Sequence, residues 1–191
     1  MSRAAGTGDE KRDTAGGRES GTADAGRRWR MALTTLLAAY GVYYLLRPGH
    51  YGLLDHVDLA IHETGHLVFA PFGEFLGMLG GTLFQLLVPA AFVWYFTRRG
   101  ERYSASVAWW WVAQSCWNIS VYVKDARGQA LPLLGGGEHD WAYLLGELDL
   151  LHHDQAIGSL VRLAGGLLLA HAVLRGFACA RTGNTRPEED R

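Results

Sequence analysis

Residues 75–97 read FLGMLGGTLFQLLVPAAFVWYFT, a run of 23 residues without one charged side chain. A helix needs about 20 mostly apolar residues to cross a hydrocarbon core of about 30 Å. The stretch before it, residues 53–72, reads LLDHVDLAIHETGHLVFAPF and is 20 residues long, but it carries six ionisable side chains. The two stretches together indicate a helical membrane protein that contains one unusually polar helix.

Three further apolar segments lie outward from this pair, at residues 29–46, 104–123 and 157–180. Of the 37 charged residues in the chain, only 19 fall among the 150 residues from 31 to 180. That share is about half of the ~25% typical of soluble domains. The sequence therefore predicts an all-α integral membrane protein with four to five membrane helices, forming one polytopic domain over residues 29–180.

The two ends of the chain differ from this middle. Residues 1–28 contain no Ile, Leu, Val or Phe, so they cannot bury enough apolar surface to offset the entropy of ordering. We expect a disordered cytoplasmic tail there and a polar C-terminal tail at residues 181–191. The net charge of −1 argues against a protein that binds nucleic acid through bulk positive charge.

The distribution of arginine predicts an orientation in the membrane. Arginines cluster in three places, namely Arg27, Arg28 and Arg30, then Arg98, Arg99 and Arg102, and finally Arg175, Arg181 and Arg186. Positive loops favour the cytoplasm, whereas the acidic stretch 124–156 belongs outside. Four crossings place all three clusters inside if residues 53–72 enter the membrane without crossing it; five full crossings are the alternative. We expect a cell-membrane protein with both termini in the cytoplasm.

The polar segment contains His62-Glu63-Thr64-Gly65-His66, an H-E-x-x-H motif. Residues four apart lie on the same face of a helix, so His62 and His66 can bind one Zn²⁺ while Glu63 acts as general base on a zinc-bound water. Ionisable groups inside a membrane segment each cost about 2.5 kcal/mol or more unless they are paired. A bound metal would compensate several of them at once.

A catalytic zinc site needs a third protein ligand and one open position. We expect Asp140 to be that ligand, because it follows a glycine turn at residues 135–137 that would let the backbone approach the metal. His139 and Asp125 are the alternatives. A purely structural interpretation is that Asp140 caps the short helix that follows it.

Other polar residues of the apolar segments have two interpretations each. Asp55 or Asp58 can accept the second ring N–H of a ligand histidine, or they can lie at the water-exposed start of a helix, which we favour for Asp55. Gln85, Gln114 and Asn118 can face a water path or a substrate strand, or they can join helices by hydrogen bonds, which we favour. The glycine stripe at positions 73, 77 and 81 is typical of close helix packing.

The embedded HETGH motif, the glycine-rich segment after it and the distant Leu131-Pro132 turn followed by glycines and an aspartate resemble the site-two protease family of intramembrane zinc metalloproteases. The resemblance covers about residues 53–145. It implies that His62 and His66 bind zinc, that Glu63 is the base and that a distal aspartate completes the site. The family usually has Leu-Asp-Gly at the distal motif, whereas this chain has LPLLGGGEHDW.

The main hypothesis is therefore a zinc metalloendopeptidase acting on a membrane protein or peptide in the lipid bilayer. A non-catalytic metal-binding membrane scaffold is the second. A di-iron membrane oxygenase that uses His62, His66, His152 and His153 is the third, although such enzymes need more clustered histidines than the eight present.

Overall fold

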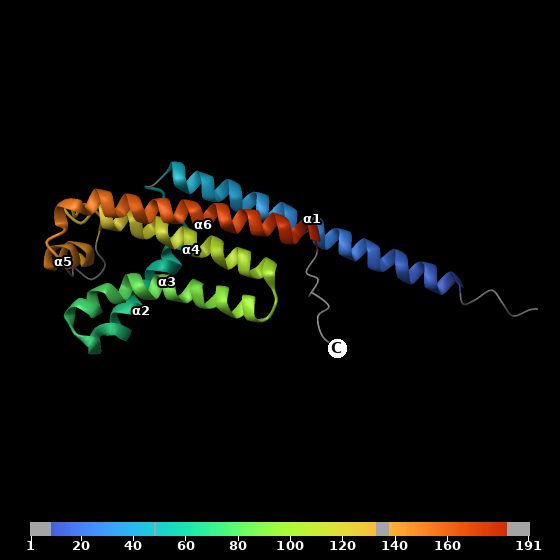
Figure 1. Cartoon of the computed structure of the whole chain (residues 1–191), viewed down its shortest axis with the longest axis horizontal. Helices are drawn as coiled ribbons and strands as arrows, with labels where there is room; N and C mark the ends of the chain where they lie inside the picture. The colour runs from blue at the N-terminus through green and yellow to red at the C-terminus, as the bar shows by residue number, and fades with distance from the viewer. Residues whose placement is uncertain (1–8, 48, 133–137, 183–191) are drawn as a thin grey trace, which may run out of the picture.

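The computed structural model describes residues 9–47, 49–132 and 138–182. In chain order its helices are α1 (Asp9–Leu46), α2 (Leu53–Phe69), the 3₁₀ turn η1 (Ala70–Phe72), α3 (Glu74–Arg98), α4 (Arg102–Lys124), α5 (Asp140–Glu147), the 3₁₀ turn η3 (Leu151–His153) and α6 (Asp154–Thr182). The regular structure in these ranges is all helical, which confirms the all-α part of the predicted class. Figure 1 shows the long helices running side by side, with α5 at one end of the bundle.

The first helix begins earlier than expected. We expected residues 1–28 to be disordered, whereas α1 is helical from Asp9 onward; residues 1–8 lie outside the described part. Elongating a nucleated helix adds one hydrogen bond per residue fixed, and half of the added residues 9–28 are Ala, Glu, Lys or Arg, which are good helix formers, although four glycines lie among them. Figure 1 shows this part of α1 projecting beyond the other helices. Of the predicted C-terminal tail, Arg181 and Thr182 complete α6, and residues 183–191 are not described.

The contact between α4 and α6 forms the centre of the bundle. Small residues recur every seven positions along the buried face of α6, at Gly158, Gly165, Ala172 and Cys179. A Cβ atom added at Gly165 would lie 2.5 Å from Nε1 of Trp117 and 3.0 Å from the carbonyl oxygen of Ala113, both on α4. Small residues let two helix backbones approach closely, and the large side chains of α4 fill the space that they leave.

The polar segment 53–72 forms a helix that stops short of its predicted end. α2 ends at Phe69, and Pro71 lies in the turn η1 that follows, because proline lacks an N–H for the helical ladder and clashes with the preceding turn. Gly73, with φ of 101°, then turns the chain into α3. This left-handed conformation favours glycine.

The two helices of this hairpin pack against each other through glycine. A Cβ atom at Gly65 of α2 would lie 2.3 Å from the carbonyl oxygen of Gly80 on α3. Of the predicted stripe at positions 73, 77 and 81, only Gly81 makes a comparably close approach, to the ring of His62. The helix contact itself runs through Gly80, which lies outside that stripe. It brings the backbone of α3 directly against the face of α2 that carries the two motif histidines.

Helix α2 covers only part of the height of the bundle. Asp55, in its first turn, is hydrogen-bonded to Gln114 in the middle of α4 (3.0 Å). Two turns later, the ring of His62 lies 5.9 Å from that of Tyr122, near the C-terminal end of α4. α2 therefore runs beside the second half of α4.

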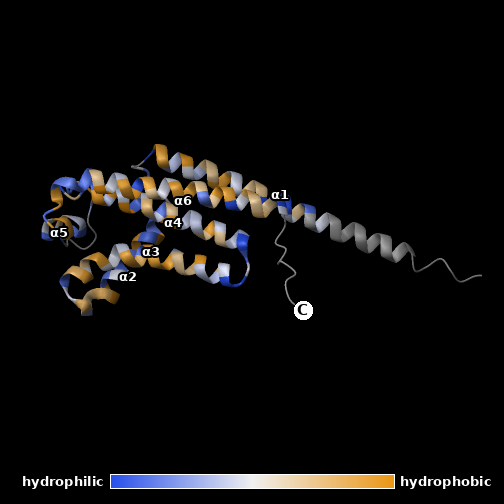
Figure 2. Ribbon diagram, in the orientation of Figure 1, coloured by the Kyte–Doolittle hydropathy of each residue, from blue (hydrophilic) through white to orange (hydrophobic). Residues whose placement is uncertain are grey.

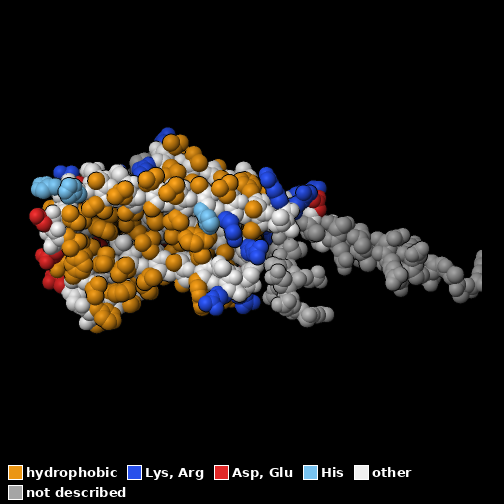
Figure 3. All heavy atoms as spheres, in the orientation of Figure 1, with side chains coloured by type: hydrophobic (Ala, Val, Ile, Leu, Met, Phe, Trp, Pro, Cys, Tyr) orange, Lys and Arg blue, Asp and Glu red, His pale blue; other side chains and the backbone are white. Residues whose placement is uncertain are grey.

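The surface of the molecule is apolar between two polar ends. Two stretches of the described chain, Glu74–Arg98 and Leu151–Thr182, are long and apolar enough to cross a membrane. Figure 2 shows apolar residues along the helices, with polar residues at the turn between α3 and α4. Figure 3 shows apolar side chains over the visible face, Lys and Arg at the end where α3 meets α4, and Asp, Glu and His at the opposite end.

The described members of the three arginine clusters lie toward one of these ends, and Arg186 lies outside the described residues. The hydroxyl of Tyr103, at the start of α4, donates to the carbonyl oxygen of Arg30 on α1 (2.8 Å). Tyr103 also packs in one cluster with Cys179 and Ala180 at the end of α6. The start of the apolar half of α1, the turn between α3 and α4 and the end of α6 are therefore neighbours, as the predicted orientation requires.

Candidate metal centre

The motif histidines lie one helical turn apart on α2 and face the same side. Their ring centroids are 4.8 Å apart. The space for the His62 ring depends on Gly81 of α3, because a Cβ atom at that position would lie 2.5 Å from Nε2 of His62. His62 is buried, with 7% of its surface exposed, and His66 is half-buried.

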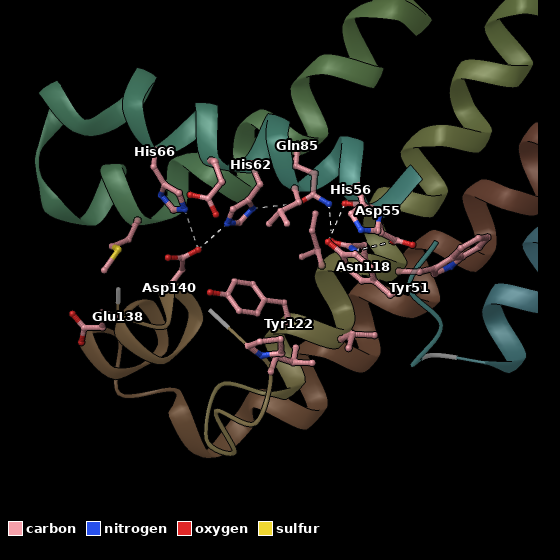
Figure 4. A pocket seen from close by; sticks show the side chains of 18 of the residues that line it. Tyr51, Asp55, His56, His62, His66, Gln85, Asn118, Tyr122, Glu138 and Asp140 are labelled. Carbon is pink, nitrogen blue, oxygen red and sulfur yellow. Dashed lines mark hydrogen bonds and ion pairs between the residues drawn. The ribbon is translucent and has the colours of Figure 1, made fainter. Parts of the chain in front are cut away.

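Asp140 brings a carboxylate to these two rings from a distant part of the chain. Its Oδ2 atom lies 2.8 Å from Nε2 of His62 and 3.2 Å from Nε2 of His66. The ligand atoms of the three residues lie within 4.8 Å of one another, so the group can hold a metal ion, and it is the one such group among the described residues. The structure thus brings the three predicted ligands together (Figure 4).

The other ring nitrogens are held by oxygen atoms that only accept hydrogen bonds. Nδ1 of His62 donates to Oε1 of Gln85 (3.2 Å), and Nδ1 of His66 donates to the carbonyl oxygen of Gly77 (2.8 Å). With the neutral-ring proton on Nδ1, each Nε2 atom presents a lone pair toward the carboxylate. The two Nε2 atoms and the Asp140 carboxylate then all direct lone pairs at one another and repel. A positive charge between them, either protons added to the rings or one divalent cation, removes this repulsion.

The ionisation of Asp140 agrees with this arrangement. Burial raises the pKa of its carboxyl, but the hydrogen bonds with His62 and His66 and the charge of those rings lower it more, so the pKa falls to about 2. Asp140 is therefore a carboxylate at neutral pH, as a metal ligand must be.

The three ligand residues and Glu63 line one cavity of about 1010 Å³. Glu63 is exposed, one residue after His62 and on the same helix. Tyr122 also lines the cavity, and Figure 4 shows its hydroxyl directed toward Asp140. The carboxylate of Glu63 and the phenol of Tyr122 thus share the cavity with the candidate metal position.

The alternatives to Asp140 lie outside the cluster. His139 and Asp125 face each other, with Nε2 of His139 3.6 Å from Oδ2 of Asp125. Asp125 accepts hydrogen bonds from the backbone N–H groups of Ala130 and Leu131 (3.0 and 2.9 Å). His152 and His153, which the oxygenase hypothesis requires, are exposed on η3 and do not belong to the cluster.

The capping role suggested for Asp140 is wrong. The N-cap of α5 is His139, whose Nδ1 atom accepts a hydrogen bond from the backbone N–H of Ala142 (3.2 Å). Asp140 is the first residue of the helix itself, and its side chain turns to the two histidines. The predicted glycine turn at residues 135–137 lies outside the described residues.

The interpretation of Asp55 as a water-exposed residue is also wrong. Asp55 and Asp58 are both buried, with 1% and 0% of their surfaces exposed. No hydrogen bond links either carboxylate directly to a ligand histidine: Asp55 accepts from side chains of α1 and α4, and Asp58 accepts from Nε1 of Trp111 (2.9 Å). Amphipathic helix starts usually face water, and only the tertiary packing shows that this one does not.

Two features of the site carry no signal that could be recognised in the sequence. The carbonyl oxygen of Gly77 acts through the backbone, and Tyr122 is one of eight tyrosines. By contrast, Gln85, Gln114 and Asn118 do join helices by hydrogen bonds, as favoured. Comparison of the chain with models of protein families, with curated proteins and with solved structures finds no match.

Proposed function

We propose that this chain is a membrane-embedded zinc metalloendopeptidase that hydrolyses peptide bonds of a membrane-associated substrate. The observation that carries the proposal is the convergence of His62, His66 and Asp140, with their lone pairs directed to one point, beside the free carboxylate of Glu63. Two imidazoles and one carboxylate are a catalytic zinc set, which leaves a fourth position open. The same spacing and roles underlie the resemblance to the site-two protease family.

The chemistry follows from the donor set and from the residues beside it. Zinc bound there would polarise the scissile carbonyl and make a water molecule more acidic. The Glu63 carboxylate would accept the proton of the attacking water and pass it to the leaving amine. The Nδ1 contacts of His62 and His66 keep both Nε2 atoms directed at the metal position throughout.

The surface of the molecule supports a location in the bilayer. Large apolar side chains are exposed along α1, α3 and α6, including Leu36 (64%), Trp94 (62%) and Leu167 (66%). A soluble monomer does not expose such extended apolar surface. We propose that α1, α3, α4 and α6 cross the cell membrane, that α2 enters it without crossing, and that both termini are cytoplasmic.

The cavity supports a peptide substrate that comes from within the membrane. It is about 1010 Å³ and extends from Tyr44 and Asp55, deep in the bundle, to Leu131 and Glu138 near its acidic end. A space of this size accepts an extended peptide segment. A scaffold that keeps the metal for structure alone would not need a free carboxylate in the same cavity.

The experiment that tests the function compares wild-type protein with Glu63→Gln in proteoliposomes. The amide keeps the size of the side chain but cannot accept a proton, so we expect full zinc content and a loss of about 10²- to 10⁴-fold in the rate of cleavage of single-span peptides. His62→Ala should lose both zinc and activity. A Glu63→Gln protein as active as wild type would refute the peptidase, and wild-type protein without zinc would refute the metal site.

A further inference from the structure

A chain of hydrogen bonds leads from His62 into the centre of the bundle (Figure 4). Nδ1 of His62 is bonded to Oε1 of Gln85 (3.2 Å). Nε2 of Gln85 donates to Oδ1 of Asn118 (2.9 Å), and Nδ2 of Asn118 donates to Oδ1 of Asp55 (2.9 Å). Two amides from α3 and α4 thus connect a candidate metal ligand on α2 with a buried carboxylate on the same helix.

The direction of this chain is set by Asp55. Its Oδ2 atom accepts from the backbone N–H of Gly52 (2.7 Å) and from the hydroxyl of Tyr44, and its Oδ1 atom accepts from Gln114 (3.0 Å) as well as from Asn118. Each oxygen of the carboxylate therefore receives two donors. Asp55 has only acceptor capacity toward Asn118, so the amide nitrogen of Asn118 must face it.

This constraint passes from one amide to the next. An amide that turns its nitrogen to one neighbour turns its oxygen to the other. Asn118 therefore presents its oxygen to Gln85, and Gln85 presents its oxygen to His62. The ring nitrogen Nδ1 of His62 must then carry the proton, which leaves the lone pair on Nε2.

We propose that Asp55, Asn118 and Gln85 are positioning residues that hold His62 in the Nδ1–H tautomer, so that Nε2 is free to bind the metal. The proposal rests on the metal site proposed above. The corresponding bond of His66 goes to the backbone carbonyl of Gly77, which no side-chain substitution removes. The hydrogen-bonded chain Asp55–Asn118–Gln85, which we call the relay, is therefore the support of a ligand histidine that side-chain substitutions can test. Removing a residue that hydrogen-bonds to a ligand histidine typically changes metal affinity 10- to 100-fold.

The substitution Asp55→Asn tests the direction of the relay. Gly52 and Tyr44 both donate at the Oδ2 position, so the new amide oxygen belongs there and its nitrogen faces Asn118. Both amides of the relay must then reverse, with the nitrogen of Gln85 leaving the neighbouring carboxylate of Asp58 to face His62. Nδ1 of His62 must accept, the proton moves to Nε2, and the metal-binding lone pair is lost.

The double variant Asp55→Asn/Gln85→Glu restores an acceptor next to His62. The new carboxylate accepts from His62 and from the reversed Asn118, whose oxygen accepts from the new amide at position 55. Every hydrogen bond along the relay is again satisfied, and the number of buried carboxylates is unchanged. A merely structural role predicts that the double variant, with two buried changes, is worse than the single one.

The measurement is the dissociation constant of full-length protein in detergent for zinc, by competition with a chromophoric chelator, together with the visible spectrum of the cobalt form. We expect Asp55→Asn and Gln85→Met each to weaken zinc binding about 10- to 100-fold. The double variant should recover most of the loss. Gln114→Met is the matched control, because it removes a buried glutamine bonded to Asp55 that lies outside the path to His62, and it should bind zinc as wild type does.

The outcomes separate this inference from the proposed function. Wild-type protein that binds no zinc removes the metal site and the relay with it. If wild type binds zinc, a Gln85→Met protein of equal affinity, or a double variant no better than Asp55→Asn, overturns the relay and leaves the metal site standing. The unfolding temperature of each metal-free variant shows whether lost affinity reflects lost folding, and the double variant decides the question if Gln85→Met does not fold.

Discussion

His62 is constrained on each side of its ring by a different kind of contact. Gln85 meets Nδ1, Asp140 meets Nε2, and the backbone of α3 at Gly81 lies against the ring. Because a ligand must be held within a fraction of an ångström of its productive position, the glycine matters as much as the polar partners. A helix position usually tolerates alanine in place of glycine with a gain in stability, so Gly81 offers a clear test.

We expect Gly81→Ala to weaken zinc binding by about tenfold or more, because the added Cβ atom would lie 2.5 Å from Nε2 of His62 and must displace the ring. Gly77→Ala, one turn earlier on the same helix, is the control. Its Cβ atom would meet Ala70 at an ordinary 3.5 Å, and its carbonyl oxygen still accepts from His66. Equal zinc affinity of the two variants, measured by chelator competition, would contradict this account.

The third ligand is tested by a pair of aspartates. Asp140→Asn keeps the shape of the side chain but removes its negative charge, so we expect zinc to be lost at concentrations that saturate wild type. Asp125→Asn should keep zinc, because Asp125 binds backbone N–H groups outside the cluster. Metal analysis of the two purified proteins gives the answer. Retained zinc in Asp140→Asn would remove this residue from the site.

At the scale of helices, the line of small residues on α6, which we call the seam, determines how closely α4 can approach. The seam consists of Gly158, Gly165, Ala172 and Cys179. Gly165 and Gly166 are adjacent, but a Cβ atom at Gly165 would overlap Trp117, whereas one at Gly166 would meet nothing within 4 Å. Trp117 is buried, with 3% of its surface exposed. The pair therefore separates the effect of packing from the intrinsic preference of the helix for alanine.

We expect Gly165→Ala to destabilise the bundle by about 1–3 kcal/mol through overpacking. Gly166→Ala should stabilise it by about 0.5–1 kcal/mol, because alanine loses less backbone entropy than glycine on entering a helix. Thermal unfolding in detergent measures both. A similar change in unfolding temperature for the two variants would mean that the seam does not limit the packing of α4 on α6.

The sequence predicts these helices well because length and apolar character are local properties. The helical segments, the short helix after the acidic loop and the motif face of α2 all follow from them. The burial of Asp55 and the cap at His139 do not, because both depend on which residues of distant segments become neighbours. Asp140 was preferred over Asp125 and His139 from the sequence, because of the glycine turn before it, but its approach to both motif histidines depends on the tertiary structure.

At the scale of the whole molecule, the orientation proposed in the membrane follows from geometry and charge together. Arg30, Tyr103 and Ala180 mark one end of the bundle, and α5 marks the other. If α2 crossed the bilayer fully, the loop after α3 and the start of the apolar half of α1 would face opposite sides. The contact between Arg30 and Tyr103 therefore favours four crossings over five for a bundle embedded in a bilayer. The two models of topology predict different accessible residues.

Three single cysteines distinguish the models in intact cells treated with a membrane-impermeant thiol reagent. Phe72, Arg99 and Glu147 are all exposed in the structure, and the unsubstituted protein, whose two cysteines are buried, gives the background. We expect Phe72→Cys and Glu147→Cys to be labelled from outside, and Arg99→Cys to be labelled only after the cells are opened, because the arginine-rich end faces the cytoplasm. Five full crossings, entered from the cytoplasm, predict the reverse at all three positions. Labelling of Arg99→Cys in intact cells would therefore overturn both the proposed orientation and the non-crossing course of α2.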